Sequence, residues 1–210
     1  MVEAYLRQSP LAHLHLGARA ISDADSNDAG VGIQELPHRV QIAVRGSSSD
    51  KAFTAATNRV LSIDLPVTPC SSSGDVEGIH ALWMGPDEWL IVAPANGYDG
   101  LASKLATSLV GVHAAVVDVS ESRTTIRLSG SNARDTLSKG CSIDLHPRAF
   151  TKSKVVNTLL AQAHVTLHQV TDSDVDGCIY DIFVHRSFAE YLWSWLEDAT
   201  RAYGLQVFAD

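Results

Sequence analysis

The two halves of this 210-residue sequence repeat one pattern of strands and helices. Residues 40–53 (VQIAVRGSSSDKAF) align with residues 124–137 (TTIRLSGSNARDTL), and residues 89–105 align with residues 181–196. Each half has the order strand, helix, strand hairpin and helix, with one further strand that leads back. This order is typical of the split βαβ unit of ferredoxin-like proteins. The repeat therefore predicts an α+β fold in which two ferredoxin-like units pack together as one body.

Composition suggests where each unit begins. Residues 22–32 (SDADSNDAGVG) are polar, acidic and glycine-containing, which is typical of an exposed loop. We therefore expect an N-terminal arm with an acidic loop over residues 1–36. A first ferredoxin-like unit is expected over residues 37–114, and a second over residues 115–210.

Helix signals support this division. Ser49 or Asp50 can cap a helix that begins near residue 51. The last helix is expected to begin after Ser187 and to end at Gly204. Two apolar stripes at helical spacing should face the cores of the two units: Leu101, Leu105 and Leu109 in one helix, and Leu192, Trp195, Leu196 and Ala199 in the other.

Charge and hydropathy exclude several classes of partner. The chain has 24 acidic and 16 basic residues, a formal net charge of -8, and no block of like charges. Nucleic acid and anionic membranes select clustered Lys and Arg, so neither is expected as a partner. No apolar run approaches the roughly 20 residues that span a bilayer, and the N-terminal stretch does not resemble a secretory signal.

The three cysteines are Cys70, Cys141 and Cys178, and no two of them form a Cys-x-x-Cys pair. An odd number of separated thiols is typical of a reducing compartment rather than of a disulfide framework. Together with the absence of a signal sequence, this favours a cytoplasmic location.

Motifs for cofactor and metal binding are incomplete. Gly30 and Gly32 begin a Gly-x-Gly-x-x-Gly spacing, but Glu35 stands where the last glycine should be. The segment Asp172–Gly177 (DSDVDG) imitates the start of a calcium loop, yet Phe183 occupies the position of its bidentate glutamate. Neither a dinucleotide nor a calcium site is expected, and the aspartates are interpreted as a hairpin turn.

Two histidine pairs have spacings found in metal sites. His13 and His15 are two residues apart, and His164 and His168 would share one face of a strand. A zinc site needs three or four ligands, and neither pair has a local third one. We therefore expect surface or hydrogen-bonded histidines and no metal bound by this chain.

The segment KGCSIDLHPRAF (residues 139–150) is rich in polar side chains for a simple connection. Cys141 and His146 could form a nucleophile and base, although a third group that orients the base is missing. The interpretation we prefer is a fixed loop, on which Asp144, His146 and Arg148 are candidates for contact with a partner. No catalytic residue is assigned.

A second polar segment, DVSESR, follows a strand and contains Asp118, Ser120 and Glu121. Two interpretations remain open for it. The side chains can satisfy a β-turn, or they can form an edge that meets a ligand or partner.

The segment ALWMGPDEWLIVAP places Trp83 and Trp89 on opposite sides of a Gly-Pro-Asp-Glu turn. Both flanks are strand formers, so a β-hairpin is expected. The two indoles then lie on opposite arms and can stack across the pair.

Four segments carry a resemblance to a known family. They are LWMGPDEWLIV, VDVSESRTTIRLSG, ARDTLSKGCSIDLHPRAF and FVHRSFAEYLWSWLEDATRAYG. In this order they resemble the gamma subunit of heterotetrameric sarcosine oxidase, and the opening SPLAHL also fits. They cover about a third of the chain.

The resemblance implies a fold similar to that of the folate-binding aminomethyltransferases. It also implies a complex in which alpha and beta subunits carry FAD, NAD and FMN and a small delta subunit binds zinc. That complex oxidises sarcosine to glycine with oxygen, giving hydrogen peroxide, and releases formaldehyde or passes the one-carbon unit to tetrahydrofolate. The gamma subunit itself has no redox centre, so a noncatalytic role in assembly and positioning is implied here.

A subunit of a stable complex buries aromatic anchors in its partners. We expect Trp89 and Trp195 in the core, and Trp83 and Trp193 at a partner interface. The main alternative is a folate-binding protein or an aminomethyltransferase-like enzyme that acts alone. It requires a carboxylate beside folate, for which Asp87, Glu88 and Asp118 are the candidates. A ligand-sensing ferredoxin-like module is a third interpretation, but it leaves the loop of residues 139–150 unexplained.

Overall fold

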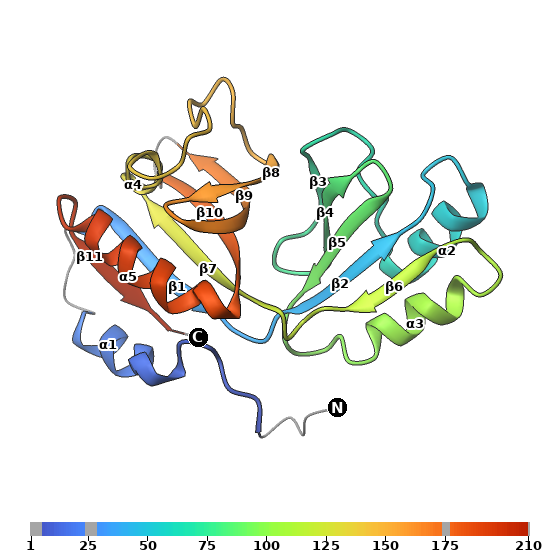
Figure 1. Cartoon of the computed structure of the whole chain (residues 1–210), viewed down its shortest axis with the longest axis horizontal. Helices are drawn as coiled ribbons and strands as arrows, with labels where there is room; N and C mark the ends of the chain where they lie inside the picture. The colour runs from blue at the N-terminus through green and yellow to red at the C-terminus, as the bar shows by residue number, and fades with distance from the viewer. Residues whose placement is uncertain (1–5, 24–28, 174–176, 210) are drawn as a thin grey trace. The chain divides into compact units, whose positions relative to one another are not determined.

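The computed structural model describes residues 6–23, 29–173 and 177–209. They form two β-sheets with helices, which confirms the expected α+β class (Figure 1). The chain divides into two compact units. Unit 1 takes in the described residues of Met1–His38, Glu121–Lys152 and Asn157–Asp210, and unit 2 takes in Arg39–Ser120 and Ser153–Val156.

Unit 2 contains a five-stranded antiparallel sheet in the order β3-β4-β5-β2-β6. Its elements are β2 (Val40–Arg45), α2 (Lys51–Leu61), β3 (Ser72–Gly74), β4 (His80–Gly85), β5 (Glu88–Ala93), α3 (Leu101–Ser108) and β6 (Ala115–Asp118). Strand β5 lies between β2 and β4, and β2 lies between β5 and β6. This is the split βαβ arrangement expected from the repeat, with β3 added at one edge.

The core of unit 2 forms where α2 and α3 pack on the sheet. Asp50 caps α2, because its Oδ1 accepts the N–H of Ala52 at 2.8 Å. The cap fixes the start of the helix, and Phe53 then meets Trp89 of β5 with ring centroids 5.6 Å apart. The Trp89 Nε1 donates to the carbonyl oxygen of Pro66 at 2.8 Å, so its one polar atom is satisfied in the core. Burying Phe53 alone contributes roughly 2 kcal/mol.

Unit 1 contains a six-stranded sheet in the order β11-β1-β7-β10-β9-β8. Its strands are β1 (Val31–Leu36), β7 (Arg123–Gly130), β8 (Val155–Leu160), β9 (Ala163–Ser173), β10 (Gly177–His185) and β11 (Leu205–Phe208). Its helices are η2 (Ala12–Leu14), α1 (Leu16–Ser22), α4 (Ala133–Ser138), η3 (Arg186–Phe188) and α5 (Ala189–Thr200). The first two residues of β8 are grouped with unit 2.

Strand β1 is inserted into this second repeat. It pairs antiparallel with β7 and parallel with β11, and so separates two strands that would be neighbours in a simple split βαβ unit. The expected exposed loop over residues 22–32 therefore ends earlier, because Val31 and Ile33 have no exposed surface. The reason is that β1 pairs with a strand on each side, which buries the apolar residues Val31, Ile33 and Leu36 despite the polar composition before them.

The glycines of the incomplete dinucleotide motif serve strand packing. A Cβ at Gly32 would lie 2.7 Å from the Ser129 Oγ of β7, and one at Gly130 would lie 2.5 Å from the Gly30 carbonyl oxygen. Gly130 also has φ of +112°, a conformation that side chains disfavour. Gly130 therefore needs glycine, because it meets the backbone just before β1, whereas a side chain at Gly32 would meet the side chains of Ser129 and Phe208.

The observed units differ from the expected division at both boundaries. Strand β1 falls within the expected arm of residues 1–36, yet it belongs to the sheet of unit 1. Strand β6 falls within the segment expected from residue 115 onward, yet it pairs with β2 in unit 2. Each unit thus keeps the strand that follows its own second helix, as the split βαβ order requires. No helix among the described residues is long and apolar enough to span a membrane.

Candidate functional site

The tryptophan hairpin is formed by β4 and β5, and Trp83 lies directly opposite Trp89 in its register. Trp89 is about 1% exposed, whereas Trp83 is half-buried. At the turn, Arg45 of β2 contacts Asp87 at 3.0 Å and Glu88 at 3.9 Å. Both acids therefore stabilise the hairpin, and Trp83 offers the accessible indole.

Trp193 is more deeply buried than Trp195, the opposite of what was expected. Trp193 has no exposed surface, and its Nε1 donates to the Glu197 Oε1 at 2.7 Å. Trp195 is only partly buried and lies over Gly140, where an added Cβ would be 2.4 Å from the indole. The expectation of Trp193 as an interface anchor is wrong. The buried face of α5 shares Leu192, Leu196 and Ala199 with the expected stripe, but it extends to Trp193 rather than to Trp195.

The loop after α4 is held by its own polar groups. Asp144 Oδ1 accepts the N–H of His146 at 2.9 Å, and His146 Nδ1 accepts the N–H of Arg148 at 3.2 Å. Leu145 and Phe150 are buried below, while Asp144, His146 and Arg148 stay exposed. The loop is therefore fixed, as expected, and presents three polar side chains outward.

The same loop does not assemble a nucleophile. Cys141 is about 9% exposed and its backbone bridges Leu160, while His146 Nδ1 is occupied by the loop. The Lys139 side chain instead contacts the C-terminal end of α5. Its ammonium lies 4.4 Å from the Tyr203 ring centre and donates to the Ala199 carbonyl oxygen. A cation at that position is favoured by the helix dipole.

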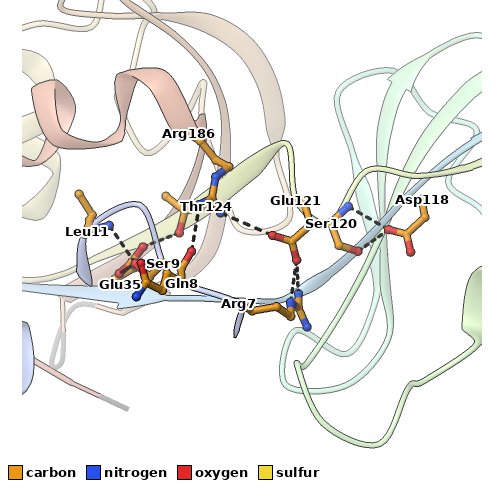
Figure 2. Close-up of polar contacts among 10 residues, drawn as sticks. All are labelled: Arg7, Gln8, Ser9, Leu11, Glu35, Asp118, Ser120, Glu121, Thr124 and Arg186. Carbon is orange, nitrogen blue, oxygen red and sulfur yellow. Dashed lines mark hydrogen bonds and ion pairs between the residues drawn. The ribbon is translucent and has the colours of Figure 1, made fainter. Parts of the chain in front are cut away.

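The turn after β6 is internally satisfied (Figure 2). Asp118 Oδ1 accepts hydrogen bonds from the Ser120 amide at 3.0 Å and from the Ser120 hydroxyl at 2.6 Å. The Ser120 Oγ also accepts the N–H of Gln41 at 3.0 Å. Of the two interpretations left open, the β-turn accounts for Asp118 and Ser120.

Glu35 anchors the arm, a role that the sequence analysis did not assign to it (Figure 2). This carboxylate is about 7% exposed. Its Oε1 accepts the Thr124 hydroxyl at 2.8 Å, and its Oε2 accepts the Ser9 hydroxyl. The Ser9 Oγ in turn accepts the N–H of Leu11 at 2.9 Å. The sequence offered one signal for this role: Glu35 stands two residues after Ile33 and four after Val31, at a strand position where a third apolar residue would be expected.

Glu121 adds a second fixing point for the arm (Figure 2). It accepts from Arg7 Nε at 2.7 Å and lies 3.6 Å from Arg186 Nη1. The Arg186 Nη2 donates to the backbone oxygen of Gln8 at 2.9 Å. Glu121 thus contacts the arm directly and through a neighbouring arginine.

Two further glutamates hold the rest of the arm on α5. Glu197 pairs with Arg19 of α1 at 2.5 Å, and Glu190 lies 3.5 Å from the His13 Nε2. The basic side chains of the arm therefore meet acids of unit 1 along its length. The arm is therefore packed onto unit 1 as part of its structure. The acidic residues that contact it hold it in place.

A polar cluster under α4 contains the perturbed ionisable groups. Arg134 Nη2 donates to Asp172 Oδ1 at 2.8 Å, and the Cys178 Sγ lies 3.2 Å from the same oxygen. Burial opposes the charged form of Asp172, but hydrogen bonds from Arg134 and Cys178 outweigh it and lower the pKa of that carboxyl. Burial opposes the charge on Arg134 too, but the bond to Asp172 and nearby groups leave its pKa raised.

Two weakly acidic groups of β10, the Cys178 thiol and the Tyr180 phenol, have raised pKa values, in contrast to Asp172. Burial, then the bond to Asp172, raises the pKa of the Cys178 thiol, and burial raises that of the Tyr180 phenol. A thiol with a raised pKa is a poor nucleophile. The cluster is therefore a structural one. The calcium-like segment that begins at Asp172 extends into residues 174–176, which lie outside the described part.

The histidine pairs lie apart from any larger ligand set. His164 is exposed and His168 is buried on one face of β9, while His15 lies between η2 and α1. Among the described residues, no group of three or more His, Cys, Asp or Glu is placed to hold a metal ion.

Comparisons with known proteins place these features in a family. Residues 45–202 match the model of the "Sarcosine oxidase, gamma subunit family", which is more than half of the chain. The sarcosine oxidase subunit gamma of Arthrobacter sp. is 35% identical over 197 residues, which cover 92% of this chain and 90% of that protein.

Solved structures also include a similar sarcosine oxidase chain. A chain of the heterotetrameric sarcosine oxidase from Corynebacterium sp. U-96, in complex with pyrrole 2-carboxylate, matches with a TM-score of 0.81 and 30% identity, covering 94% of this chain and 96% of that one. Aminomethyltransferase T of the glycine cleavage system from Bartonella henselae matches with a TM-score of 0.68 and 14% identity. The latter match covers 97% of this chain but 59% of the aminomethyltransferase, and shows a shared fold.

Proposed function

The chain belongs to the sarcosine oxidase gamma subunit family, and from this premise we propose that it serves as the gamma subunit of a heterotetrameric sarcosine oxidase. The observation that carries the proposal is coverage in both directions. More than nine-tenths of this chain aligns with nine-tenths or more of each gamma relative, in sequence and in structure. A match of this kind spans nearly the whole length of the relatives and is not confined to one shared segment.

Within such a complex, this chain acts in assembly and positioning. The groups that could have been catalytic are engaged in its own structure: Asp87 and Glu88 hold the hairpin, Asp118 holds a turn, and the Cys178 thiol is kept protonated. Positioning is a contribution to rate in its own right, because holding reacting sites together turns an encounter into an internal step.

The division of labour follows from the family resemblance. Alpha and beta subunits supply FAD, NAD and FMN, and a delta subunit binds zinc. Sarcosine is oxidised to glycine with reduction of oxygen to hydrogen peroxide, and the methyl carbon leaves as formaldehyde or is carried by tetrahydrofolate. This chain binds none of these groups in the proposal. A cytoplasmic location belongs to the same proposal and suits three cysteines that are all free thiols.

Partner contacts are proposed at Trp83 and at the outward side chains Asp144, His146 and Arg148. Trp83 is half-buried, so an interface can cover the rest of its indole. The loop residues are already ordered by hydrogen bonds, so binding through them costs little additional conformational entropy.

An independent folate-dependent enzyme is the weaker alternative. The similarity to the aminomethyltransferase is at 14% identity and spans 59% of that chain, which supports the fold alone. The three carboxylates considered for a folate site are explained by the hairpin and turn contacts.

The test is to express the tagged chain in its own host and to purify what binds to it. A yellow eluate with three further chains, an absorption spectrum of bound flavin and sarcosine-dependent peroxide formation would support the subunit role. A colourless chain eluting alone would overturn it as a stable assembly. Saturable binding of tetrahydrofolate by that lone chain would instead favour the alternative.

A further inference from the structure

Unit 1 has a hollow of about 360 Å³ that the proposed function does not use. It lies over β7, β8, β9 and β10, on residues that all belong to unit 1. A volume of this size falls at the lower end of the range for small-molecule sites, roughly 300–1,000 Å³. Its main lining residues are Arg123, Asn157, Leu159, His164, Phe183 and His185.

Strand register brings three nitrogen-bearing side chains into one row. His185 of β10 is paired with Arg123 of β7, and the preceding pair, Val184 with Val165, places His164 beside His185 on the other side. Side chains opposite each other in antiparallel strands have Cβ atoms about 5 Å apart. One guanidinium and two imidazoles therefore line one side of the hollow.

Among the polar side chains of the lining, hydrogen-bond donors predominate. Asn157 Oδ1 accepts the Thr166 hydroxyl at 2.7 Å, which directs the acceptor of that amide to the protein and leaves its NH₂ to donate. Among the residues that the structure describes, no carboxylate lines the hollow. Glu121, two residues before Arg123, is engaged by Arg7 and by Arg186.

The two imidazoles are available to a ligand. Both His164 and His185 are exposed, and neither has a hydrogen-bond or ion-pair partner among the residues that the structure describes. Arg123 already makes another interaction within the protein. It therefore contributes positive charge to the hollow, but it is not treated as an unoccupied donor. A cationic group and several donors without an acid favour an anion over a metal ion.

Apolar surface borders the same space. Leu159 is 44% exposed on the edge strand β8, and Phe183 forms part of the floor. We propose that this hollow binds a small molecule through a carboxylate or phosphate group held by His164, His185 and Arg123, with its apolar part against Leu159. The ligand class is thus a small organic anion rather than a free metal or a nucleic acid.

The test uses the full chain with ¹⁵N-labelled imidazoles, titrated at constant pH and ionic strength. One titration uses inorganic phosphate and one uses acetate, with chloride as the balancing salt, so the two sources of the oxyanion are compared directly. Saturable shifts of the His164 and His185 signals in either titration support the site. The variants His164→Gln and His185→Gln identify the two signals.

A double variant with alanine at both positions, His164→Ala and His185→Ala, should lower the association constant for phosphate, measured by calorimetry, by at least about tenfold, since two donors to a charged group are lost. His113→Gln is the matched control, because His113 is an exposed histidine of unit 2. Shifts that rise linearly with either salt, or that are equal at His113, would overturn the proposal and indicate a general ion effect.

Repeating the titration on the purified complex separates the small molecule from a partner side chain. Retained binding supports a small-molecule site, whereas loss of binding means that a partner subunit covers the hollow and overturns that assignment. The titration of the chain alone measures binding only. A negative titration would therefore overturn the anion site without bearing on the proposed subunit role, which the purification of the complex tests.

Discussion

Arg127 and Asp181 face each other on the paired strands β7 and β10 and form a two-point ion pair. Arg127 Nε lies 2.7 Å from Asp181 Oδ1, and Nη2 lies 3.0 Å from Oδ2. The Asp181 side chain has no exposed surface and that of Arg127 is 15% exposed. This geometry combines charge with directional hydrogen bonds at the centre of the unit 1 sheet.

Asp181→Ala should be strongly destabilising, because it leaves a guanidinium without its buried counter-charge. Breaking one partner of a buried pair costs about 3–5 kcal/mol in the free energy of unfolding. Urea unfolding followed by circular dichroism measures this. The control is Asp198→Ala, whose contact with Arg201 is well exposed and should not change the urea midpoint measurably. Equal midpoints for the two variants would contradict the prediction.

The repeat in the sequence predicted the order of elements, because helix and strand periods are local properties. The aligned segments became β2 with α2 and β7 with α4, and Leu101, Leu105 and Leu109 all proved buried. The hairpin followed from its turn residues. These features depend on residues that are close together in the chain, so they can be predicted from a single sequence.

The rest depended on contacts between distant segments. β1 pairs with β7 although nearly 90 residues separate them in the chain, and the composition around residue 30 suggested a loop. Glu35 could not be assigned as an anchor, since its partners Ser9 and Thr124 are remote in sequence. The choice between Trp193 and Trp195 turned on the exact rotation of one helix against its sheet.

Trp193→Ala and Trp83→Ala should separate core from interface. Removing the fully buried indole of Trp193 is expected to cost about 3–5 kcal/mol in the free energy of unfolding. Removing Trp83 should cost about 1 kcal/mol or less, because its indole is only half-buried. Thermal melting of the chain and the yield of complex in the pull-down are measured together. The prediction for Trp83 is a nearly unchanged melting temperature with reduced yield; normal yield would remove Trp83 from the interface.

Arg148→Ala tests the outward loop with little risk to folding. Its backbone N–H, not its side chain, bonds to His146, so the loop should keep its shape. We expect an unchanged melting temperature and a lower yield of complex. Asp144→Ala is the contrasting variant, because it removes the acceptor for the His146 amide and should loosen the loop itself. If Arg148→Ala assembles as well as the parent chain, this side chain makes no essential partner contact.

Glu35→Gln should release the arm. The amide replaces one of two acceptor oxygens by a donor, facing either the Ser9 or the Thr124 hydroxyl. Hydrogen bonds to charged groups are worth about 1.5–3 kcal/mol each, so amide hydrogens near Leu11 should exchange faster by at least about tenfold. Exchange measured by mass spectrometry gives the rate. Glu190→Gln is the control, because its contact with His13 is largely exposed; equal effects of the two variants would contradict a special role for Glu35.

Cys178 should resist modification and make stability fall at high pH. Burial and the contact with Asp172 raise the pKa of this thiol above its unfolded value of about 8.5. The protonated thiol therefore contributes its full stability below that value, and the contribution is lost as pH rises toward the folded pKa. Cys178→Ala should remove this part of the decline in unfolding free energy above pH of about 8.5. Under a thiol reagent at pH of about 8, peptide mapping should find Cys178 modified far more slowly than the more exposed Cys70. Equal rates would mean that the thiol is neither buried nor held by Asp172 in solution.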